Sequence, residues 1–254
     1  MNKSTTIILQ ARMGSTRLPG KMQRSFYNGK SLLRVILERL TAHFDSESIV
    51  VATSQKEDDN SIAAMAEKSG VQLFRGSETD VLERFVLAGE QFGSDYIIRI
   101  CADNPFIQTK WIKYLIGYNS DSEVDYVGFR INRTLPAIKS HLGFFPERVT
   151  LKALREVYET ITELSFREHV TNFFYSEQNN TFKTSWIDLD YPEDMVRNVR
   201  LTIDSRSDFE TANRLYRFLN ENGMEGSEEQ IFDYLKNNPD ILKTMNKNIR
   251  ANEE

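Results

Sequence analysis

In the first 120 residues, short runs of apolar residues alternate with segments in which apolar residues recur at helical spacing. Short apolar runs predict strands at Thr6–Leu9, Ser48–Ala52, Val71–Phe74 and Tyr96–Ile100. Between them, apolar residues at helical spacing predict helices at Leu32–Leu40, Asp59–Ser69, Asp80–Phe92 and Thr109–Tyr118. Strands separated by helices of this length are typical of parallel βαβ units. The pattern therefore predicts an α/β fold, with a mostly parallel central sheet and helices on both faces.

The pattern of the second half is less regular. It predicts a helix at Thr150–Glu159, a helix or turn at Arg167–Ser176, and strands at Asp125–Ile131, Thr181–Ile187 and Asn198–Ile203. Asp208–Asn222 has the pattern of an amphipathic helix, and the polar tail from about Met245 is expected to fray. No repeat or linker divides the sequence. We expect one domain over residues 1–254, with a protruding element at about 125–195.

The composition fits a soluble globular protein and excludes several classes of partner. Hydrophobic residues make up 40% and charged residues 27%, and the formal net charge of −5 offers no bulk attraction for nucleic acid. The single cysteine, Cys101, cannot form an intrachain disulfide, which favours a cytoplasmic location. Apolar runs are too short for a signal peptide or a membrane span. An anionic ligand must therefore be bound by a local cluster of positive groups.

The segment from residue 10 to residue 21 carries the strongest candidate chemistry. It follows the first predicted strand and reads Gln10-Ala11-Arg12-Met13-Gly14-Ser15-Thr16-Arg17-Leu18-Pro19-Gly20-Lys21. Small residues let backbone N–H groups approach a phosphate, and the three cations neutralise its charge. The segment matches neither a Walker A loop nor a GxGxxG fingerprint. Because ligands of such sheets bind at the carboxyl ends of the strands, we interpret it as a phosphate-binding loop rather than a solvated basic loop.

Two aspartates each follow a predicted strand. Asp103 comes just after the strand that ends at Ile100, and Asp204 directly follows Ile203. Carboxylates at such positions can hold Mg²⁺, with water and substrate phosphates completing its coordination, and two could share one ion if their strands are neighbours. The alternative is a cap, because Asp103 precedes a proline by two positions and Asp204 precedes a predicted helix.

Weaker candidates lie at other predicted ends of strands and helices. Arg75, followed by Gly76 and Asp80, suits recognition of a base carbonyl or a phosphate, but it also fits a capped helix start. His169 lies between an arginine–glutamate pair and a valine, and a lone histidine is more often structural than catalytic. The histidines and Cys101 lack zinc-ligand spacing, and no nucleophile–base arrangement is legible.

Together these segments resemble the cytidylyltransferase family that includes the CMP-KDO and CMP-sialic acid synthetases, and most closely its spore coat polysaccharide biosynthesis branch. Six stretches carry the resemblance in family order: QARMGSTRLPGK (10–21), VVATS (50–54), LFRGSETDVLERF (73–85), IIRICADNPFI (97–107), REHVT (167–171) and VRLTID (199–204). The first and fourth are specific. The resemblance implies a Rossmann-like nucleotidyltransferase fold, CTP as donor, dependence on Mg²⁺, and a homodimer formed through the protruding element.

The resemblance also implies roles for the matching residues. Arg12 and Lys21 would bind the triphosphate and stabilise the leaving pyrophosphate, and Asp103 and Asp204 would hold the metal ion. The other implied nucleotide-binding residues are Gln10, Ala11, Gly14, Ser15, Arg17, Ala52, Thr53, Ser54, Arg75 and Asp80. Nucleotidyl transfer needs little covalent help from a protein, so positioning and electrostatics would dominate catalysis.

The sequence departs from the family pattern in the acceptor region. The spore coat branch has a Gly-Leu-Asp-Val-Glu-like run before a helix, whereas this chain reads KSHLGFF at 139–145, which lacks both acidic residues. The resemblance therefore identifies no acceptor beyond a sugar or a sugar acid of nonulosonic or KDO type. The candidate acceptor residues are Arg133, Lys139, Ser140, His141 and His169.

Three other functions fit parts of the same pattern. One is a nucleotidyltransferase that uses UTP or dTTP. Another is a glycosyltransferase of related fold, although the one Asp-x-Asp motif, Asp188-Leu189-Asp190, lies far from the matching loops. The third is a nucleotide-binding module without catalysis, which would release no pyrophosphate. The three cations of residues 10–21 suit a triphosphate better than a diphosphate, which favours the cytidylyltransferase.

Overall fold

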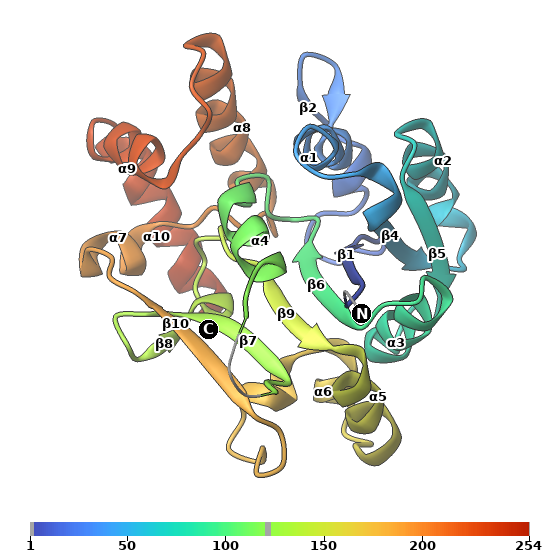
Figure 1. The fold of residues 1–254 in the computed structure, drawn as a ribbon. Coiled ribbons are helices and arrows are strands. Elements are labelled where there is room, and N and C mark those ends of the chain that lie inside the picture. Colours follow the sequence, from blue (N-terminus) through green and yellow to red (C-terminus); the bar gives the residue numbers. More distant parts are fainter. Residues whose placement is uncertain (1–2, 120–122, 254) are drawn as a thin grey trace.

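The computed structural model describes residues 3–119 and 123–253, in which a central sheet has helices on both faces (Figure 1). The main sheet has eight strands in the order β10-β7-β9-β6-β1-β4-β5, with β8 paired to β7. Its strands are β1 (Thr5–Gln10), β4 (Ile49–Ser54), β5 (Gln72–Gly76), β6 (Tyr96–Cys101), β7 (Tyr126–Ile131), β8 (Leu135–Pro136), β9 (Glu147–Thr150) and β10 (Thr184–Leu189). A small hairpin consists of β2 (Ser25–Tyr27) and β3 (Lys30–Ser31).

The helices divide between the two faces of this sheet. Their bounds are α1 (Leu32–Thr41), α2 (Asn60–Lys68), α3 (Val81–Gln91), α4 (Thr109–Ile116), α5 (Leu151–Thr160), α6 (Leu164–Glu168), α7 (Glu193–Asn198), α8 (Arg206–Glu221), α9 (Glu228–Lys236) and α10 (Pro239–Glu253). Every element predicted before residue 120 is present, with ends shifted by at most two residues. The predicted α/β architecture is confirmed.

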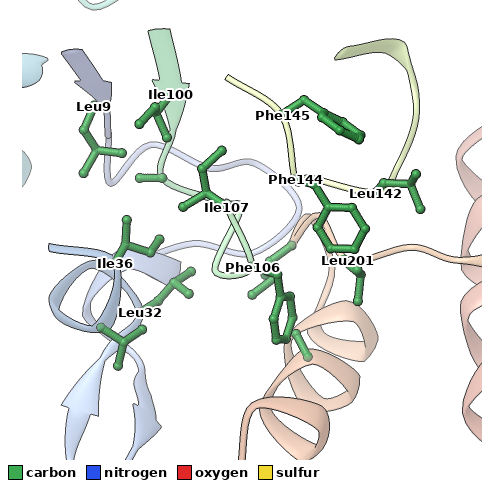
Figure 2. Close-up of a cluster of buried hydrophobic side chains, with 14 of the residues drawn as sticks. Leu9, Leu32, Ile36, Ile100, Phe106, Ile107, Leu142, Phe144, Phe145 and Leu201 are labelled. Carbon is green, nitrogen blue, oxygen red and sulfur yellow. The ribbon is translucent and has the colours of Figure 1, made fainter. Parts of the chain in front are cut away.

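Strand β1 shows why the sheet is buried on both sides. Ile7 and Leu9 belong to one hydrophobic cluster and Ile8 to another, because successive side chains of a strand point to opposite faces. In the first cluster, Leu9 and Ile100 lie above Leu32 and Ile36 of α1 (Figure 2). Since β1 pairs with both β4 and β6 in parallel, the carboxyl ends of these three strands lie side by side.

The second half of the chain extends the same sheet. Strand β9 lies antiparallel between β6 and β7, and β10 pairs in parallel with β7 at the sheet's edge. Residues 125–195, expected as a protruding element, thus contribute strands to the main sheet. The segment predicted as a helix or turn at 167–176 contains the end of α6 and a 3-10 turn at Asn172–Tyr175.

Two sequence predictions about the C-terminal third are wrong. Asn198–Ile203 is not a strand, because after α7 it runs extended without joining the sheet. Its apolar residues are buried as a strand's would be, but its N–H groups donate to the carbonyls of His141 and Asp103. The tail from Met245 belongs to α10, where Met245 and Ile249 are buried. The sequence predictions also omitted the short strands β2, β3 and β8, the strand β9, the helices α7 and α9, and the first part of α10.

Candidate active site

A cavity of about 260 Å³ opens at the carboxyl ends of β1 and β6. Its lining brings together nine residues singled out from the sequence: Gln10, Ala11, Arg12, Ser15, Arg17, Lys21, Asp103, His169 and Asp204. The remaining lining residues are Thr16, Met22, Val81, Arg99, Cys101, Ala102 and Glu168. The cavity lies where ligands bind in open α/β sheets, and it combines several cations with several carboxylates.

The loop after β1 supplies the cations. Arg12 and Arg17 are partly exposed, whereas the Lys21 side chain is only 9% exposed. The Lys21 ammonium donates to the Ile203 carbonyl at 2.7 Å, and this hydrogen bond fixes the position of the Lys21 side chain in the cavity. Gly20, with a φ of 69°, gives the chain the left-handed turn that brings Lys21 back towards the cavity. The loop thus presents three positive groups to one cavity.

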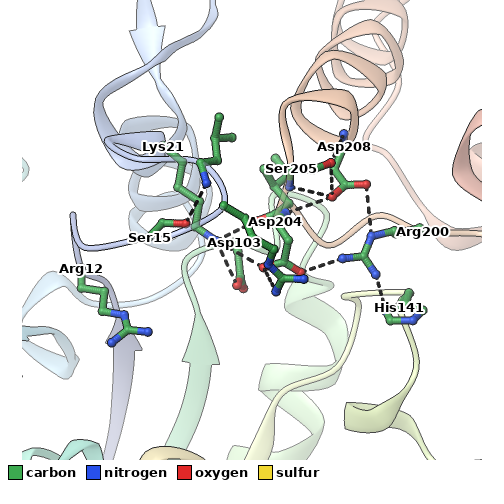
Figure 3. Close-up of polar contacts among 12 residues, drawn as sticks. Arg12, Ser15, Lys21, Asp103, His141, Arg200, Asp204, Ser205 and Asp208 are labelled. Carbon is green, nitrogen blue, oxygen red and sulfur yellow. Dashed lines mark hydrogen bonds and ion pairs between the residues drawn. The ribbon is translucent and has the colours of Figure 1, made fainter. Parts of the chain in front are cut away.

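Asp103 and Asp204 converge on one cation (Figure 3). The Lys21 ammonium lies 3.4 Å from Asp103 Oδ2 and 3.8 Å from Asp204 Oδ1. The Ile203 N–H donates to the Asp103 carbonyl at 2.9 Å, so main chain joins the two segments although 199–203 is no strand. Both carboxylates can therefore reach a shared cation on their cavity side.

This pair of carboxylates fits a hard divalent cation. Their side chains are 30% and 25% exposed, so solvent and substrate can reach them. Within the described part of the chain, no three His, Cys, Asp or Glu side chains group into a metal site. An ion held by two carboxylates takes its other ligands from water and phosphate, which is how Mg²⁺ is usually bound.

Asp59 ties the phosphate-binding loop to the end of β4. Its Oδ1 accepts from the Met13 N–H at 2.7 Å, and its Oδ2 accepts from Ser54 N at 2.9 Å and Ser54 Oγ at 2.5 Å. Burial raises the pKa of the Asp59 carboxyl, but the hydrogen bonds from Ser54 and Met13 outweigh it and hold the pKa below its usual value. The ionised Asp59 therefore fixes the loop's position over the sheet.

The predicted nucleotide-binding residues that follow the phosphate-binding loop in the sequence, among them Arg75 and Asp80, lie outside the cavity lining. Arg75 donates to the carbonyls of Ser54 and Lys56 at 2.9 and 2.7 Å and to Asn60 Oδ1 at 2.6 Å. Asp80 caps α3 and pairs with Arg167 at 2.6 Å. Both side chains thus hold the loops beside the cavity in shape, and a base contact by Arg75 stays a prediction. The other predicted nucleotide-binding residues outside the lining are Gly14, Ala52, Thr53 and Ser54.

Arg84, next to these loops, is a fully buried cation. Its Nη1 donates to the Ser77 carbonyl at 2.8 Å, while Nε and Nη2 have no hydrogen-bond partner among the described residues. Burial, with the nearby Arg12 charge, lowers the pKa of the Arg84 guanidinium to about 10. A buried charge with orphan donors is destabilising, so α3 carries a strained position beside the cavity.

The wall formed by β6 and β9 contains a buried ion pair. Arg99 Nη1 donates to Glu147 Oε2 at 2.6 Å, and Tyr126 and Thr171 also donate to the Glu147 carboxylate. Burial raises the pKa of the neighbouring Cys101 thiol to about 11, so this cavity residue is no thiolate nucleophile at neutral pH.

Glu147 also corrects the comparison with the family's acidic run. Gly143 and Glu147 have the spacing of the glycine and the final glutamate in the Gly-Leu-Asp-Val-Glu pattern. If the run is read from Gly143, the glutamate is present as Glu147 and Phe145 stands in place of the aspartate.

Four of the five candidate acceptor residues do not line the cavity. Arg133 is exposed, Lys139 lies over the Tyr175 ring, and Ser140 Oγ donates to the Ala137 carbonyl at 2.6 Å. His141 Nδ1 is 2.8 Å from Arg200 Nη1. Residues 137–139 form a short 3-10 turn, and the His141 carbonyl accepts from the N–H groups of Leu201 and Thr202, which holds this segment outside the cavity lining. Only His169 reaches the cavity.

Several residues that shape the site were not singled out from the sequence. Arg99 and Glu168 line the cavity, and Asp59 and Arg200 hold its walls from behind. Arg99 lay within a matched stretch beside Asp103, so a search for charges inside the predicted strand would have found it. Arg200 gives the same signal, because it is the charged residue inside the strand predicted at 198–203, but its contact with His141 joins segments 59 residues apart in the sequence.

A loop that carries three cations and a nearby pair of carboxylates, at the carboxyl ends of the strands, fit the active site of a nucleotidyltransferase. Comparison with known proteins identifies the family, because residues 6–241 match the model of the cytidylyltransferase family. The chain belongs to this family and is a nucleotidyltransferase. Within the described residues, no helix has both the length and the apolar content needed to span a membrane.

Relatives of known name or structure agree with this assignment. An uncharacterised protein of Methanocaldococcus jannaschii is 36% identical over 244 residues, covering 96% of this chain and 94% of its own. The spore coat polysaccharide biosynthesis protein SpsF of Bacillus subtilis is 33% identical over 239 residues, covering 92% and 94%. A solved cytidylyltransferase from Leptospira borgpetersenii superposes with a TM-score of 0.79 at 28% identity, covering 94% of this chain and 97% of its own.

Proposed function

We propose that this protein transfers CMP from CTP to a sugar or a sugar acid, with Mg²⁺ and with release of pyrophosphate, in the biosynthesis of a surface glycan. The observation that carries the proposal is the convergence of Arg12, Arg17 and Lys21 with Asp103 and Asp204 in one cavity. The family supports CTP as donor, and the name of the Bacillus subtilis relative supports a polysaccharide pathway.

The phosphate-binding loop would hold the triphosphate. Arg12, Arg17 and Lys21 would neutralise its charge, and the loop held by Asp59 is fixed before the nucleotide arrives. Preorganised cations need no reorganisation when negative charge builds up on the leaving pyrophosphate, which makes them effective stabilisers of the transition state. The partial exposure of Arg12 and Arg17 leaves them able to close onto the phosphates.

Asp103 and Asp204 would hold the Mg²⁺ ion, which supplies charge neutralisation and polarisation of the α-phosphate when it is bound. The two carboxylates position the nucleotide relative to the acceptor side of the cavity. Lys21, whose ammonium contacts both carboxylates, would bind the phosphates beside them. Holding both reactants in line accounts for a large part of the rate enhancement in such transfers.

The acceptor would lie on the β6–β9 side of the cavity. Arg99, Cys101 and His169 line that side, and the Arg99–Glu147 pair makes it a polar, fixed wall. Polar walls of this kind suit the hydroxyl and carboxylate groups of a sugar or sugar acid. His169 is the one predicted acceptor residue placed to touch it.

We also propose that each chain folds as a single domain and that the protein acts in the cytoplasm as a homodimer. Strand β10 is the last strand at one edge of the main sheet and belongs to the region that the family resemblance assigns to dimerisation. Sedimentation equilibrium tests the proposal: a mass of about twice 29.5 kDa supports the dimer, and a mass that stays near 29.5 kDa at high concentration rejects it.

A calorimetric titration tests the donor assignment. CTP, UTP, dTTP, ATP, GTP and CDP are titrated with and without Mg²⁺ into wild type and Asp103→Ala. The proposal requires that CTP binds most tightly and that the substitution abolishes the magnesium effect. A preference for another triphosphate, or equal affinity for CDP and CTP, rejects the donor assignment. Acceptors are then screened by CTP-dependent release of pyrophosphate.

A further inference from the structure

Asp204 lies on a segment that the sheet does not hold. Residues 199–205 lack a strand partner, and the main-chain bonds just before Asp204 are those from Leu201 and Thr202 to the His141 carbonyl and from Ile203 to the Asp103 carbonyl. These bonds fix the path of the backbone, but they leave the direction of the Asp204 carboxylate undetermined. A carboxylate that shares an ion with Asp103 needs a fixed orientation.

The Arg200 guanidinium supplies that orientation. Its side chain is 1% exposed and contacts three partners: Nη2 donates to Asp204 Oδ2 at 2.7 Å, Nε donates to Asp208 Oδ1 at 3.1 Å, and Nη1 lies 2.8 Å from His141 Nδ1 (Figure 3). Because an arginine can only donate, the His141 nitrogen accepts this hydrogen bond. Because the guanidinium is planar, hydrogen bonds to Asp208 and His141 fix its orientation, and it then fixes the orientation of the Asp204 carboxylate.

The two oxygens of Asp204 consequently face different surroundings. Oδ2 is engaged by Arg200, whereas Oδ1 lies 3.2 Å from Arg17 and 3.8 Å from Lys21, both of which line the cavity. Only the Oδ1 side of the carboxylate is turned towards ligands. This arrangement favours monodentate binding of an ion by the Asp204 carboxylate over bidentate binding.

The C-terminal helix supports the same network from behind. Asp208 Oδ2 accepts from Ser205 N and from the Asp204 N–H, at 2.8 and 3.2 Å. Asn248 of α10 donates to Asp208 Oδ1 at 2.9 Å. The family match ends at residue 241, so this support comes from a part of the chain beyond the matched segment. A hydrogen-bonded path therefore runs from α10 through Asp208 and Arg200 to Asp204.

We propose that Arg200 is a positioning residue that aims Asp204 Oδ1 at the bound metal, and that Asn248 of the C-terminal helix supports it through Asp208. The proposal rests on the proposed function, because it assumes that Asp204 holds a divalent ion. Outer groups that orient a metal ligand typically account for about a 10- to 100-fold difference in metal affinity. Asn248 contacts Asp208 rather than Asp204, so its substitution should change the metal affinity less than that of Arg200.

Binding of Mn²⁺ tests the proposal without turnover. Free Mn²⁺ is measured by EPR while it is titrated into protein saturated with CTP in the absence of acceptor. We expect Arg200→Lys to raise the Mn²⁺ dissociation constant at least about tenfold. Asn248→Ala should raise it about threefold, the equivalent of one ordinary hydrogen bond. CTP affinity measured without metal should stay within about twofold of wild type in both variants, since neither residue lines the cavity.

Asn246→Ala is the matched control. Asn246 also lies on α10, but it donates to Asn198 and takes no part in the path to Asp204. It should leave the Mn²⁺ dissociation constant unchanged. Equal Mn²⁺ affinity in wild type, Asn248→Ala and folded Arg200→Lys overturns the positioning role. If Arg200→Lys does not fold, Asn248→Ala against Asn246→Ala decides the question. If wild type itself binds no Mn²⁺ with CTP, the proposed function fails instead.

Discussion

The two carboxylates of the cavity are held by different means. Asp103 follows β6, whose strand is bonded on both sides, so its place is set by the main chain. Asp204 follows a segment outside the sheet, and side chains from α8, α10 and residue 141 fix it through Arg200. Regular main-chain bonding tolerates many sequences, whereas the second arrangement depends on individual side chains. The two halves of the site should therefore respond differently to substitution.

Lys21 joins the two halves, and its loss should have the largest effect. It contacts Asp103, Asp204 and the Ile203 carbonyl. We expect Lys21→Met to lower kcat/KM for CTP about 1000-fold, because a preorganised cation at the developing charge is removed. Steady-state release of pyrophosphate measures it. Lys30→Met, which breaks only the surface pair with Glu38, is the control. A loss below about tenfold would exclude Lys21 from the phosphate site.

Asp103→Asn and Asp204→Asn test whether the two carboxylates act as one site. Each should lower kcat/KM about 100-fold at saturating Mg²⁺, since each removes one charged ligand of the same ion. The double variant should be only a few-fold worse than either single one, because residues that act as a unit are not additive. Fully multiplicative losses in pyrophosphate release would mean that the two act independently.

Asp59→Asn tests, through stability, how the loop after β1 is held on the side of the site opposite Asp204. We expect a loss of about 2 kcal/mol in the free energy of unfolding at pH 7, because charge-assisted hydrogen bonds to Met13 and Ser54 are weakened. Urea unfolding measures it, and Asp58→Asn, at an exposed neighbour, is the control. An equal loss in both variants would contradict the bridging role.

The pH dependence of this difference has a definite sign. The pKa of Asp59 is lowered in the folded protein, so the folded state favours the ionised form. Its contribution is complete above the ordinary carboxyl pKa of about 3.9 and is lost as the pH falls through the lower folded pKa. The difference between wild type and Asp59→Asn should therefore be constant near neutrality and shrink in acid.

Arg84→Met should have the smallest effect, and one of opposite sign. The substitution replaces a buried cation with two orphan donors by an apolar chain of similar length. Replacing such buried charges is often neutral or stabilising, so we expect the free energy of unfolding to rise by about 1 kcal/mol. Arg197→Met at an exposed position is the control. A loss of more than about 1 kcal/mol would show that Arg84 is compensated.

The same contrast explains what the sequence could predict. The fold of the first half could be predicted because hydrophobic periodicity identifies its strands and helices. Its part of the site could be predicted because β1 and β6 are parallel neighbours, which brings Gln10–Lys21 and Asp103 together. The extended segment 199–203 has a strand's pattern of burial without a strand's bonds, and periodicity cannot separate the two. The tail from Met245 is polar on average, yet Met245 and Ile249 face the core at helical spacing. Arg200 lies inside the matched stretch 199–204, but the sequence could not show that its guanidinium also reaches His141.

A crystal structure with CTP and Mn²⁺ tests the central claim most directly, with the metal located by its anomalous signal. We expect one Mn²⁺ at about 2.1 Å from a carboxylate oxygen of Asp103 and from Asp204 Oδ1, with Asp204 Oδ2 still bonded to Arg200. The triphosphate should lie against Arg12, Arg17 and Lys21. A metal bound away from either carboxylate, or a triphosphate outside this cavity, would show that the site is assigned wrongly.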